Sequence, residues 1–347
     1  MLFRSNGQLG LGNRTYYSSP KQIGALTAWS AVSTGLDGED STAIKTDGTL
    51  WSWGRNNLGQ LGLGNRTNYS SPKQVGALTN WSNIISGYST KIAIKTDGTL
   101  WAWGYNSYGN LGLGTRTYYS SPKQVGALTN WSKIFASYHT LAIKTDGTLW
   151  VWGYNNYGQL GFGNLTHYSS PKQVGALTNW SSISGGQAHS VAVKTDGTLW
   201  AWGGSFTNYG QLGLGNTTNY SSPKQVGILT NWLNVACGSY HTLAIKTNGT
   251  LWVWGYNGTG QLGLNNTTNY SSPKQVGALT TWSSIIGVNH TIALKTDGTL
   301  WAWGNNNKGQ LGFGNTTYYS SPKQIGTLTS WIKISAGFYT TTAIARY

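Results

Sequence analysis

The sequence predicts an all-β fold, a seven-bladed β-propeller of four-stranded repeats about 50 residues long, and three observations carry this prediction. Only 9% of the 347 residues are charged, while the chain holds 49 Gly, 19 Trp and 21 Tyr. This composition is typical of strands joined by turns rather than of helices. All seven prolines stand in one phrase, Ser-Ser-Pro-Lys-Gln, at spacings of 49 to 52 residues. Six of the units contain an Asp-Gly or Asn-Gly pair after the second strand, a strong hairpin signal.

One repeat shows how the four strands are assigned. Residues 131–136, which begin with Trp, predict the first strand, and the β-branched, alternating residues 139–144 predict the second. Thr145-Asp146-Gly147 forms the hairpin turn, and Thr-Leu-Trp-Val-Trp at 148–152 predicts the third strand. A Gly-rich loop leads to a fourth strand near residues 171–174.

The tryptophans follow the same period. Seven of them come just after a Leu-Thr pair, and the other twelve form six Leu-Trp-x-Trp-Gly segments such as Trp51/Trp53. Residues two apart on a strand point to the same face. We therefore expect these indoles to pack between neighbouring blades.

The third strand occurs six times, whereas the other three occur seven times. Met1–Asn6 occupy the place where the third strand of this unit should end. Residues 342–347, at the other end of the sequence, belong to its second strand. We expect a single domain of residues 1–347 in which the seventh blade is shared between residues 1–28 and 329–347, so that N- and C-terminal strands join to close the ring. Three alternatives remain for its third strand: the blade has three strands, another chain supplies one by β-augmentation, or the sequence is a piece of a longer protein.

The repeated pattern Gly-x-x-His-Thr-x-Ala-(Ile/Leu)-x-x-Asp-Gly-x-Leu-Trp-x-Trp-Gly-x-Asn-x-x-Gly-Gln-Leu-Gly resembles the repeat of the regulator of chromosome condensation family over essentially the whole chain. The resemblance implies a seven-bladed propeller and is closest in style to bacterial and phage repeat proteins. It does not imply one function, because the family includes an exchange factor for the Ran GTPase, a plant ultraviolet-B photoreceptor and a secreted β-lactamase inhibitor. Photoreception is not expected, because the Trp and Arg of the photoreceptor's sensing phrase are missing from Ser137-Tyr138-His139-Thr140.

Catalytic residues are not apparent. Five of the eight acidic residues lie in hairpins, and four of the five histidines share one place at the start of the second strand, which favours a structural hydrogen bond. Cys237 is the only cysteine, so no disulfide forms within the chain. The remaining acidic residues form an insertion at 37–40, interpreted as a solvated variable loop rather than a calcium site. We predict a protein that is not an enzyme and has no cofactor and no metal site.

We expect two sets of loops to emerge on the same face of the ring. One set joins the first strand of a blade to the second, and the other joins the third strand to the fourth. Exposed aromatic and amide side chains there suit a protein or glycan partner. The candidate partner-binding residues are Asp37, Glu39, Asp40, Tyr105, Tyr108, Tyr154, Tyr157, Phe206, Tyr209 and Tyr256.

The opposite face should be basic, because the formal net charge is +15 and most lysines fall in two repeated positions. An anionic partner could bind there, but evenly spread lysines predict nucleic-acid binding that is unspecific at most. The candidate basic face consists of Lys21, Lys73, Lys123, Lys172, Lys224, Lys274 and Lys323.

The predicted function is a non-enzymatic binding or structural module that presents its loops to a protein or glycan partner, as a bacterial surface or phage virion component. The alternatives are a guanine-nucleotide exchange factor that also binds chromatin, and a secreted enzyme inhibitor. Localisation is not determined, although a surface or virion setting is favoured. No apolar run is long enough for a membrane span, and this sequence shows no signal peptide.

Overall fold

The computed structural model describes residues 6–24 and 28–346, and in this part of the chain it contains 26 strands and no helix. The first blade consists of β1 (Trp29–Thr34), β2 (Asp40–Lys45), β3 (Leu50–Gly54) and β4 (Tyr69–Gln74). The second and third consist of β5 (Trp81–Ser86), β6 (Thr90–Lys95), β7 (Leu100–Gly104) and β8 (Tyr119–Gln124), and of β9 (Trp131–Ala136), β10 (His139–Lys144), β11 (Leu149–Gly153) and β12 (Tyr168–Gln173). The fourth and fifth consist of β13 (Trp180–Gly185), β14 (His189–Lys194), β15 (Leu199–Gly203) and β16 (Tyr220–Gln225), and of β17 (Trp232–Cys237), β18 (His241–Lys246), β19 (Leu251–Gly255) and β20 (Tyr270–Gln275). The sixth consists of β21 (Trp282–Gly287), β22 (His290–Lys295), β23 (Leu300–Gly304) and β24 (Tyr319–Gln324), and β25 (Trp331–Gly337) and β26 (Thr340–Ala345) follow.

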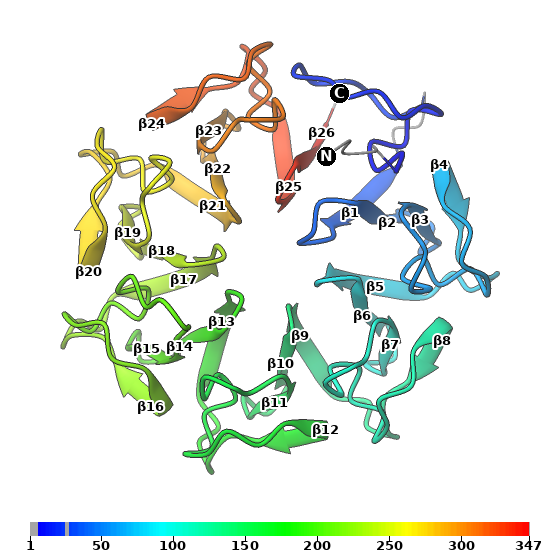
Figure 1. The fold of residues 1–347 in the computed structure, drawn as a ribbon, viewed down its shortest axis with the longest axis horizontal. Coiled ribbons are helices and arrows are strands. Elements are labelled where there is room, and N and C mark those ends of the chain that lie inside the picture. The colour runs from blue at the N-terminus through cyan, green and yellow to red at the C-terminus, as the bar shows by residue number, and fades with distance from the viewer. Residues whose placement is uncertain (1–5, 25–27, 347) are drawn as a thin grey trace.

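Within each blade the four strands run antiparallel in sequence order. The first strand lies nearest the centre of the ring and the fourth lies outermost (Figure 1). The hairpin turn predicted in each repeat joins the second strand to the third. In the third blade, the Asp146 carboxylate accepts hydrogen bonds from the backbone N–H and the hydroxyl of Thr148, at 2.9 and 2.6 Å. Gly147 takes the positive φ that this turn requires.

The prediction of seven four-stranded blades is wrong. The described residues form six four-stranded blades, and a two-stranded sheet of β25 and β26 stands between the sixth blade and the first. The fourth-strand phrase is present at residues 17–22 but forms no strand. The reason is that a fourth strand pairs only with a third, and no Leu-Trp-x-Trp-Gly segment is available to this sheet. Met1–Ser5, which should have ended that strand, lie outside the described residues.

The ring is nevertheless closed between its first and last strands. The N–H of Thr34 in β1 donates to the hydroxyl of Ser335 in β25 at 2.8 Å, and the hydroxyls of Thr34 and Thr342 are 2.8 Å apart. The N-terminal segment also reaches the sixth blade, because the N–H of Gly314 donates to the Ser18 carbonyl at 2.7 Å. The two ends of the described chain therefore meet at one place, which we call the seam.

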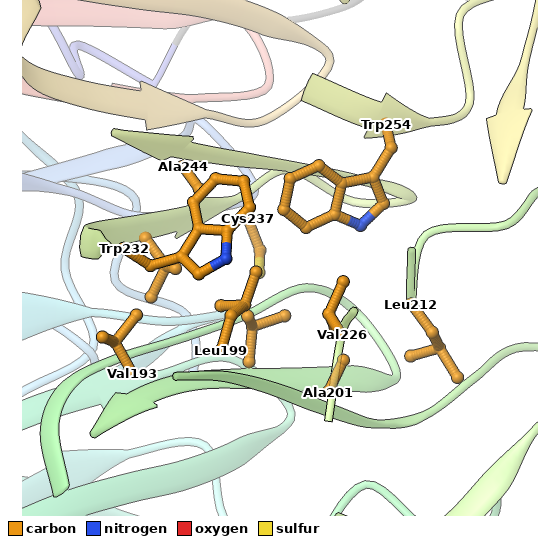
Figure 2. Close-up of a cluster of buried hydrophobic side chains, with 11 residues drawn as sticks. Val193, Leu199, Ala201, Leu212, Val226, Trp232, Cys237, Ala244 and Trp254 are labelled. Atoms are coloured by element: carbon orange, nitrogen blue, oxygen red, sulfur yellow. The ribbon is translucent and has the colours of Figure 1, made fainter. Parts of the chain in front are cut away.

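The hydrophobic core lies between blades rather than within them. Figure 2 shows the cluster between the fourth and fifth blades, where Leu199 and Val226 of one blade pack against Trp232 and Trp254 of the next. Comparable clusters occupy the other complete interfaces. The predicted role of the tryptophan pairs between blades is thus confirmed.

One hydrogen bond recurs at these interfaces. The second indole of each Leu-Trp-x-Trp-Gly segment is buried, and its N–H donates to a backbone carbonyl in the preceding Gly-(Gln/Asn)-Leu-Gly turn, which for Trp53 lies in the N-terminal segment. In the fourth blade, Trp202 donates to the Gln159 carbonyl at 2.8 Å, and the hydroxyl of Ser190 donates to the same oxygen at 2.8 Å. A single carbonyl therefore connects two strands of the next blade.

Candidate functional site

A cavity of about 520 Å³ opens among the loops of the second to fifth blades. Eight of its lining residues are aromatic, and we call it the tyrosine hollow. It is lined by Tyr105, Tyr108, Tyr138, Tyr154, Tyr157, Gln187, Ala188, Ser205, Phe206, Thr207, Tyr209 and Tyr240.

The hollow combines the two sets of loops that were expected to share a face. Tyr105, Tyr154 and Phe206 come from loops between third and fourth strands, whereas Tyr138 and Tyr240 come from loops between first and second strands. Six of the candidate partner-binding residues line it: Tyr105, Tyr108, Tyr154, Tyr157, Phe206 and Tyr209. Tyr256 does not, but its ring lies 4.7 Å from that of Tyr209, centroid to centroid.

Sequence reasoning missed the residues that join the hollow to the centre of the ring. The Tyr88 and Tyr138 rings stack 4.1 Å apart, and Phe338 of the two-stranded sheet lies against Tyr88. The Gln187 amide donates to the Tyr88 hydroxyl at 2.8 Å and accepts from the Tyr240 hydroxyl at 2.5 Å. Side chains from loops of five sheets thus meet across the ring. The sequence signal that could have identified Tyr138 and Tyr240 is that an aromatic residue directly precedes His139 and His241.

The hollow is electrically neutral. Among the described residues none of its lining side chains is acidic, basic or a histidine. Burial raises the pKa of Tyr105, Tyr138, Tyr154 and Tyr240, so their hydroxyls stay protonated and can donate hydrogen bonds at neutral pH. Such a surface offers flat apolar rings and hydroxyl groups rather than charge.

The acidic candidates are not part of the hollow. Asp40 is fully buried at the start of β2, where its carboxylate lies 2.5 Å from the ammonium of Lys91. Glu39 pairs with Arg55, and Asp37 accepts a hydrogen bond from the Ser89 hydroxyl at 2.8 Å. The interpretation of residues 37–40 as a solvated loop is therefore wrong for Asp40, which belongs to a strand and contacts the next blade.

The four repeated histidines are structural, as predicted, but their hydrogen bonds cross between blades. His139 Nε2 lies 2.8 Å from the Ser190 hydroxyl, and His290 Nε2 lies 2.9 Å from that of Thr341. Complete burial lowers the pKa of His139, His189, His241 and His290 to about 3. These imidazoles are therefore neutral at physiological pH.

Other reactive groups are equally enclosed. Burial raises the pKa of the Cys237 thiol to about 12, which disfavours the nucleophilic thiolate. Over residues 6–24 and 28–346, no three His, Cys, Asp or Glu side chains lie close enough together to hold a metal ion. The same part of the chain has no helix with the length and apolar character needed to cross a bilayer.

The candidate basic face is distributed around the outside of the ring. Six of its lysines lie on the outermost strands, one per blade, and Lys21 lies in the N-terminal segment. The second repeated lysine position is the one in the Lys-Thr-(Asp/Asn)-Gly hairpins, and we call its members the hairpin lysines. They lie against indoles, as in the third blade, where the Lys144 ammonium is 3.7 Å from the Trp150 ring centroid. The seven candidate lysines are thus spaced around the rim of the ring, and an anionic partner stays a prediction.

Two relatives share short stretches with the chain. The ultraviolet-B receptor UVR8 of Arabidopsis thaliana is 37% identical over 70 residues, which is 20% of this chain and 16% of that protein. The serine/threonine-protein kinase Nek8 of Danio rerio is 34% identical over 71 residues, which is 20% of this chain and 10% of that protein. The matched stretches thus span only a small part of both relatives.

Solved structures match over nearly the whole chain. Human WBSCR16 is 21% identical with a TM-score of 0.83, covering 95% of this chain and 89% of that one. Prp20p of Saccharomyces cerevisiae, described together with its binding to Gsp1p and histones, is 19% identical with a TM-score of 0.84, covering 98% and 89%. At these identities the likeness concerns the fold.

The family model that matches describes the regulator of chromosome condensation (RCC1) repeat. It matches six successive segments, residues 47–94, 97–143, 146–193, 196–245, 248–294 and 297–344. Each segment runs from one hairpin turn to the second strand of the following sheet, which for the last segment is β26, so the matched unit spans the interface between two sheets. The six segments cover most of the sequence, and the chain belongs to the regulator of chromosome condensation (RCC1) repeat family.

Proposed function

We propose that this propeller is a non-enzymatic binding module and that the tyrosine hollow receives its partner, a segment of a protein or a glycan. The observation that carries the proposal is the convergence of eight aromatic rings from four blades on one neutral cavity. Aromatic rings with a polar edge contribute large contact areas at interfaces and lose little conformational entropy on binding. The absence of charge from the described lining favours an uncharged ligand surface.

The rigidity of the site supports the same function. Tyr108 lies against Tyr154 with ring centroids 4.7 Å apart, and Tyr154 lies against Tyr138 at 6.1 Å. Rings that are already held in place lose little further freedom on binding, which increases affinity. Phe206, which is 93% exposed at the edge of the hollow, is free to contact a partner directly.

The two alternative functions have less support. The exchange-factor alternative rests on the family resemblance alone, and the acidic residues outside the hairpins are already engaged, because Asp40 is buried in an ion pair and Glu39 is paired with Arg55. An inhibitor inserts a projecting element into an active site, whereas the hollow is concave. A bacterial surface or virion setting remains part of the proposal, supported by the low charge content and the abundance of Asn, Thr, Ser and Gly.

Binding at the hollow is testable with a double variant, Tyr157→Ala/Tyr209→Ala, against a panel of immobilised neutral oligosaccharides and a library of displayed peptides. Tyr318→Ala is the matched control, because this tyrosine is 45% exposed and does not line the hollow. We expect the double variant to keep its melting temperature and to lose at least about tenfold in affinity for whatever the native chain retains, as expected for aromatic anchor residues. Equal retention by both variants would place binding elsewhere.

A further inference from the structure

One small residue lies at the base of the tyrosine hollow. Ala188, which is 5% exposed, lines the hollow from the fourth blade and directly precedes His189 at the start of β14. The equivalent residues of the third and fifth blades are Tyr138 and Tyr240, and both also line the hollow. An alanine thus stands where each neighbouring blade places a phenol ring.

The backbone at Ala188 is arranged as in the neighbouring blades. The Ala188 carbonyl accepts a hydrogen bond from the N–H of Gly204 at 2.9 Å, and the Tyr240 carbonyl accepts one from the N–H of Tyr256 at the same distance. The gap in the row of tyrosines is therefore a matter of the side chain alone. It leaves the room of a missing ring open to a ligand. All of the lining residues belong to the second to fifth blades, so the hollow lies away from the seam.

The rings on either side of the gap are held by other tyrosines. The centroids of Tyr138 and Tyr154 lie 6.1 Å apart with their planes inclined at 62°, and those of Tyr240 and Tyr209 lie 5.9 Å apart at 68°. Rings inclined in this way leave slots between them rather than one flat platform. Grooves lined by aromatic rings are the surfaces on which proline-rich segments dock in several kinds of recognition domain.

The polar side chains of the hollow have hydrogen-bond donors to spare. Gln187 carries the single amide of the described lining, and its oxygen already accepts from the Tyr240 hydroxyl while its nitrogen donates to Tyr88. Within residues 6–24 and 28–346, no group of the chain bonds the hydroxyls of Tyr157 and Tyr209. Their O–H groups are therefore available to a ligand.

These polar groups distinguish the two kinds of partner. A sugar presents hydroxyls that donate as well as accept, and burying a donor without an acceptor is costly. The side chains of the described lining offer as acceptors only hydroxyl oxygens and the engaged oxygen of Gln187, and no carboxylate. A proline has a carbonyl that accepts but no N–H, and the polyproline II helix makes no internal hydrogen bonds. A proline-rich segment therefore matches the donors of the hollow better than a sugar does.

We infer, resting on the proposed function of the hollow, that its partner is a proline-rich protein segment in the polyproline II conformation. One pyrrolidine ring fills the gap over Ala188, between Tyr138 and Tyr240, and neighbouring prolines pack against the other rings. The hydroxyls of Tyr157 and Tyr209 donate to carbonyl groups of the segment. The neutral lining suits a segment without charged residues, and a helix that is already extended in solution loses little conformational entropy on binding.

The first test uses the 347-residue chain and fluorescently labelled decaproline, which forms this left-handed helix in water. We expect saturable binding of one peptide per chain by fluorescence anisotropy. Deca-D-proline is the matched control, because it has the same composition and forms the mirror-image helix. It should bind at least about tenfold more weakly, since its rings and carbonyls do not align with the slots and hydroxyls of the hollow. Equal binding of the two peptides, or no saturable binding of decaproline, would overturn the inference.

The gap is tested by filling it. Ala188→Tyr gives the fourth blade the residue that both neighbouring blades carry, so the variant should keep its melting temperature and bind decaproline at least about tenfold more weakly. Asn289→Tyr changes the equivalent position of the sixth blade, which does not line the hollow, and should bind as the native chain does. Undiminished binding by Ala188→Tyr would contradict the placement of the proline.

The hydroxyl groups are tested without altering the rings. Tyr157→Phe/Tyr209→Phe keeps the aromatic surface and removes two donors, so decaproline should bind about fivefold or more weakly. An unchanged affinity would refute the assignment of these hydroxyls as donors to the segment.

Maltohexaose, a neutral oligosaccharide, separates this inference from the proposed function. If maltohexaose binds the native chain, fails to bind Tyr157→Ala/Tyr209→Ala and is not displaced by decaproline, the hollow is a glycan site. The proposed function then stands and the inference of a proline-rich partner is wrong. If neither probe binds and the double variant retains every ligand of the native chain, both are wrong.

Discussion

Lys91 in β6 and Asp40 in β2 form a fully buried ion pair across the interface between the first two blades, with 2.5 Å between the ammonium and carboxylate atoms. At the corresponding positions of the third and fourth blades, His139 meets Ser190. The two pairs have the same separation of 51 residues along the chain. One interface has thus replaced a neutral hydrogen bond with a pair of opposite charges while keeping its geometry.

The ion pair should be sensitive to the loss of one partner. We expect Lys91→Met to lower the free energy of unfolding by about 3–5 kcal/mol, because it leaves the Asp40 carboxylate buried without a counter-charge. The double variant Asp40→His/Lys91→Thr, which recreates the pair of the other interfaces, should recover most of this loss. Arg55→Ala, which breaks the more exposed pair with Glu39, should cost no more than about 1 kcal/mol. Urea unfolding of the variants at pH 7.5 measures these differences, and a Lys91→Met chain as stable as the native one would show that the pair contributes nothing.

Stability should fall as the pH decreases from about 6.5 towards 3. Unfolded histidines have pKa values near 6.5, whereas His139, His189, His241 and His290 have pKa values of about 3 in the folded chain. Between these values the unfolded chain binds more protons, so its formation is favoured as the pH falls. Asp40 acts in the opposite direction, because burial raises its pKa to about 7 and the folded chain holds that proton.

Proton uptake on unfolding measures this balance. At pH 5 four histidines gain close to one proton each and Asp40 releases one, so the net uptake should be about three protons. Urea unfolding between pH 4.5 and 5.5 gives this number from the slope of the free energy. A slope near zero would mean that the histidines are already charged in the folded ring.

The tryptophans between blades should dominate stability. Trp202 is fully buried, and Trp202→Ala should cost about 3–5 kcal/mol from the lost packing alone. Lys123→Ala on the outermost strand of the second blade should stay within about 0.5 kcal/mol of the native chain. Melting temperatures compare the two variants, and an unchanged value for Trp202→Ala would refute its role between blades.

The hairpin lysines offer a test of cation–π contacts. The Lys144 ammonium lies 3.7 Å from the Trp150 ring centroid and 5.1 Å from that of Trp131. We expect Lys144→Met to lose about 0.5–2 kcal/mol, and Lys144→Arg to keep most of that contribution because the guanidinium also binds aromatic faces. Thermal unfolding in low and high salt distinguishes this contact from long-range charge effects, which salt screens. If Lys144→Met and Lys144→Arg were equally stable, the contribution of Lys144 to stability would come from its alkyl stem and not from its charge.

The strand pattern was predictable because each repeat carries its own local signals. In the third blade the expected second strand, residues 139–144, coincides with β10 (His139–Lys144), and the Asp-Gly turn lies where it was placed. The number of four-stranded blades was not predictable in this way. The seventh blade was inferred from the recurrence of its first, second and fourth strands, but a fourth strand forms only when a third strand is present to pair with it. Strand formation depends on that pairing and cannot be assigned to residues 17–22 from their sequence alone.

The candidate site was predictable only in part, because some of its residues follow from the order of the strands and others depend on how the strands pair. Tyr154 and Tyr157 were assigned to the correct face, because alternating antiparallel strands place every second loop on one side. Asp40 was misassigned because an insertion shifted the apparent start of its strand. Its position opposite Gly54, equivalent to His139 opposite Gly153, becomes evident only when the pairing is known. The lysine–indole contacts were missed because they join the two ends of a hairpin through side chains rather than through the backbone.

The two-stranded sheet gives the ring one joint unlike the rest. Within residues 6–24 and 28–346, every other second strand pairs with a strand on both edges, whereas β26 pairs with β25 alone. Amide hydrogens exchange with solvent through local openings whose free energy falls with the number of such restraints. Among the second strands, the amides of β26 should therefore exchange first. The ring can then open locally at the two-stranded sheet while its six complete blades stay folded.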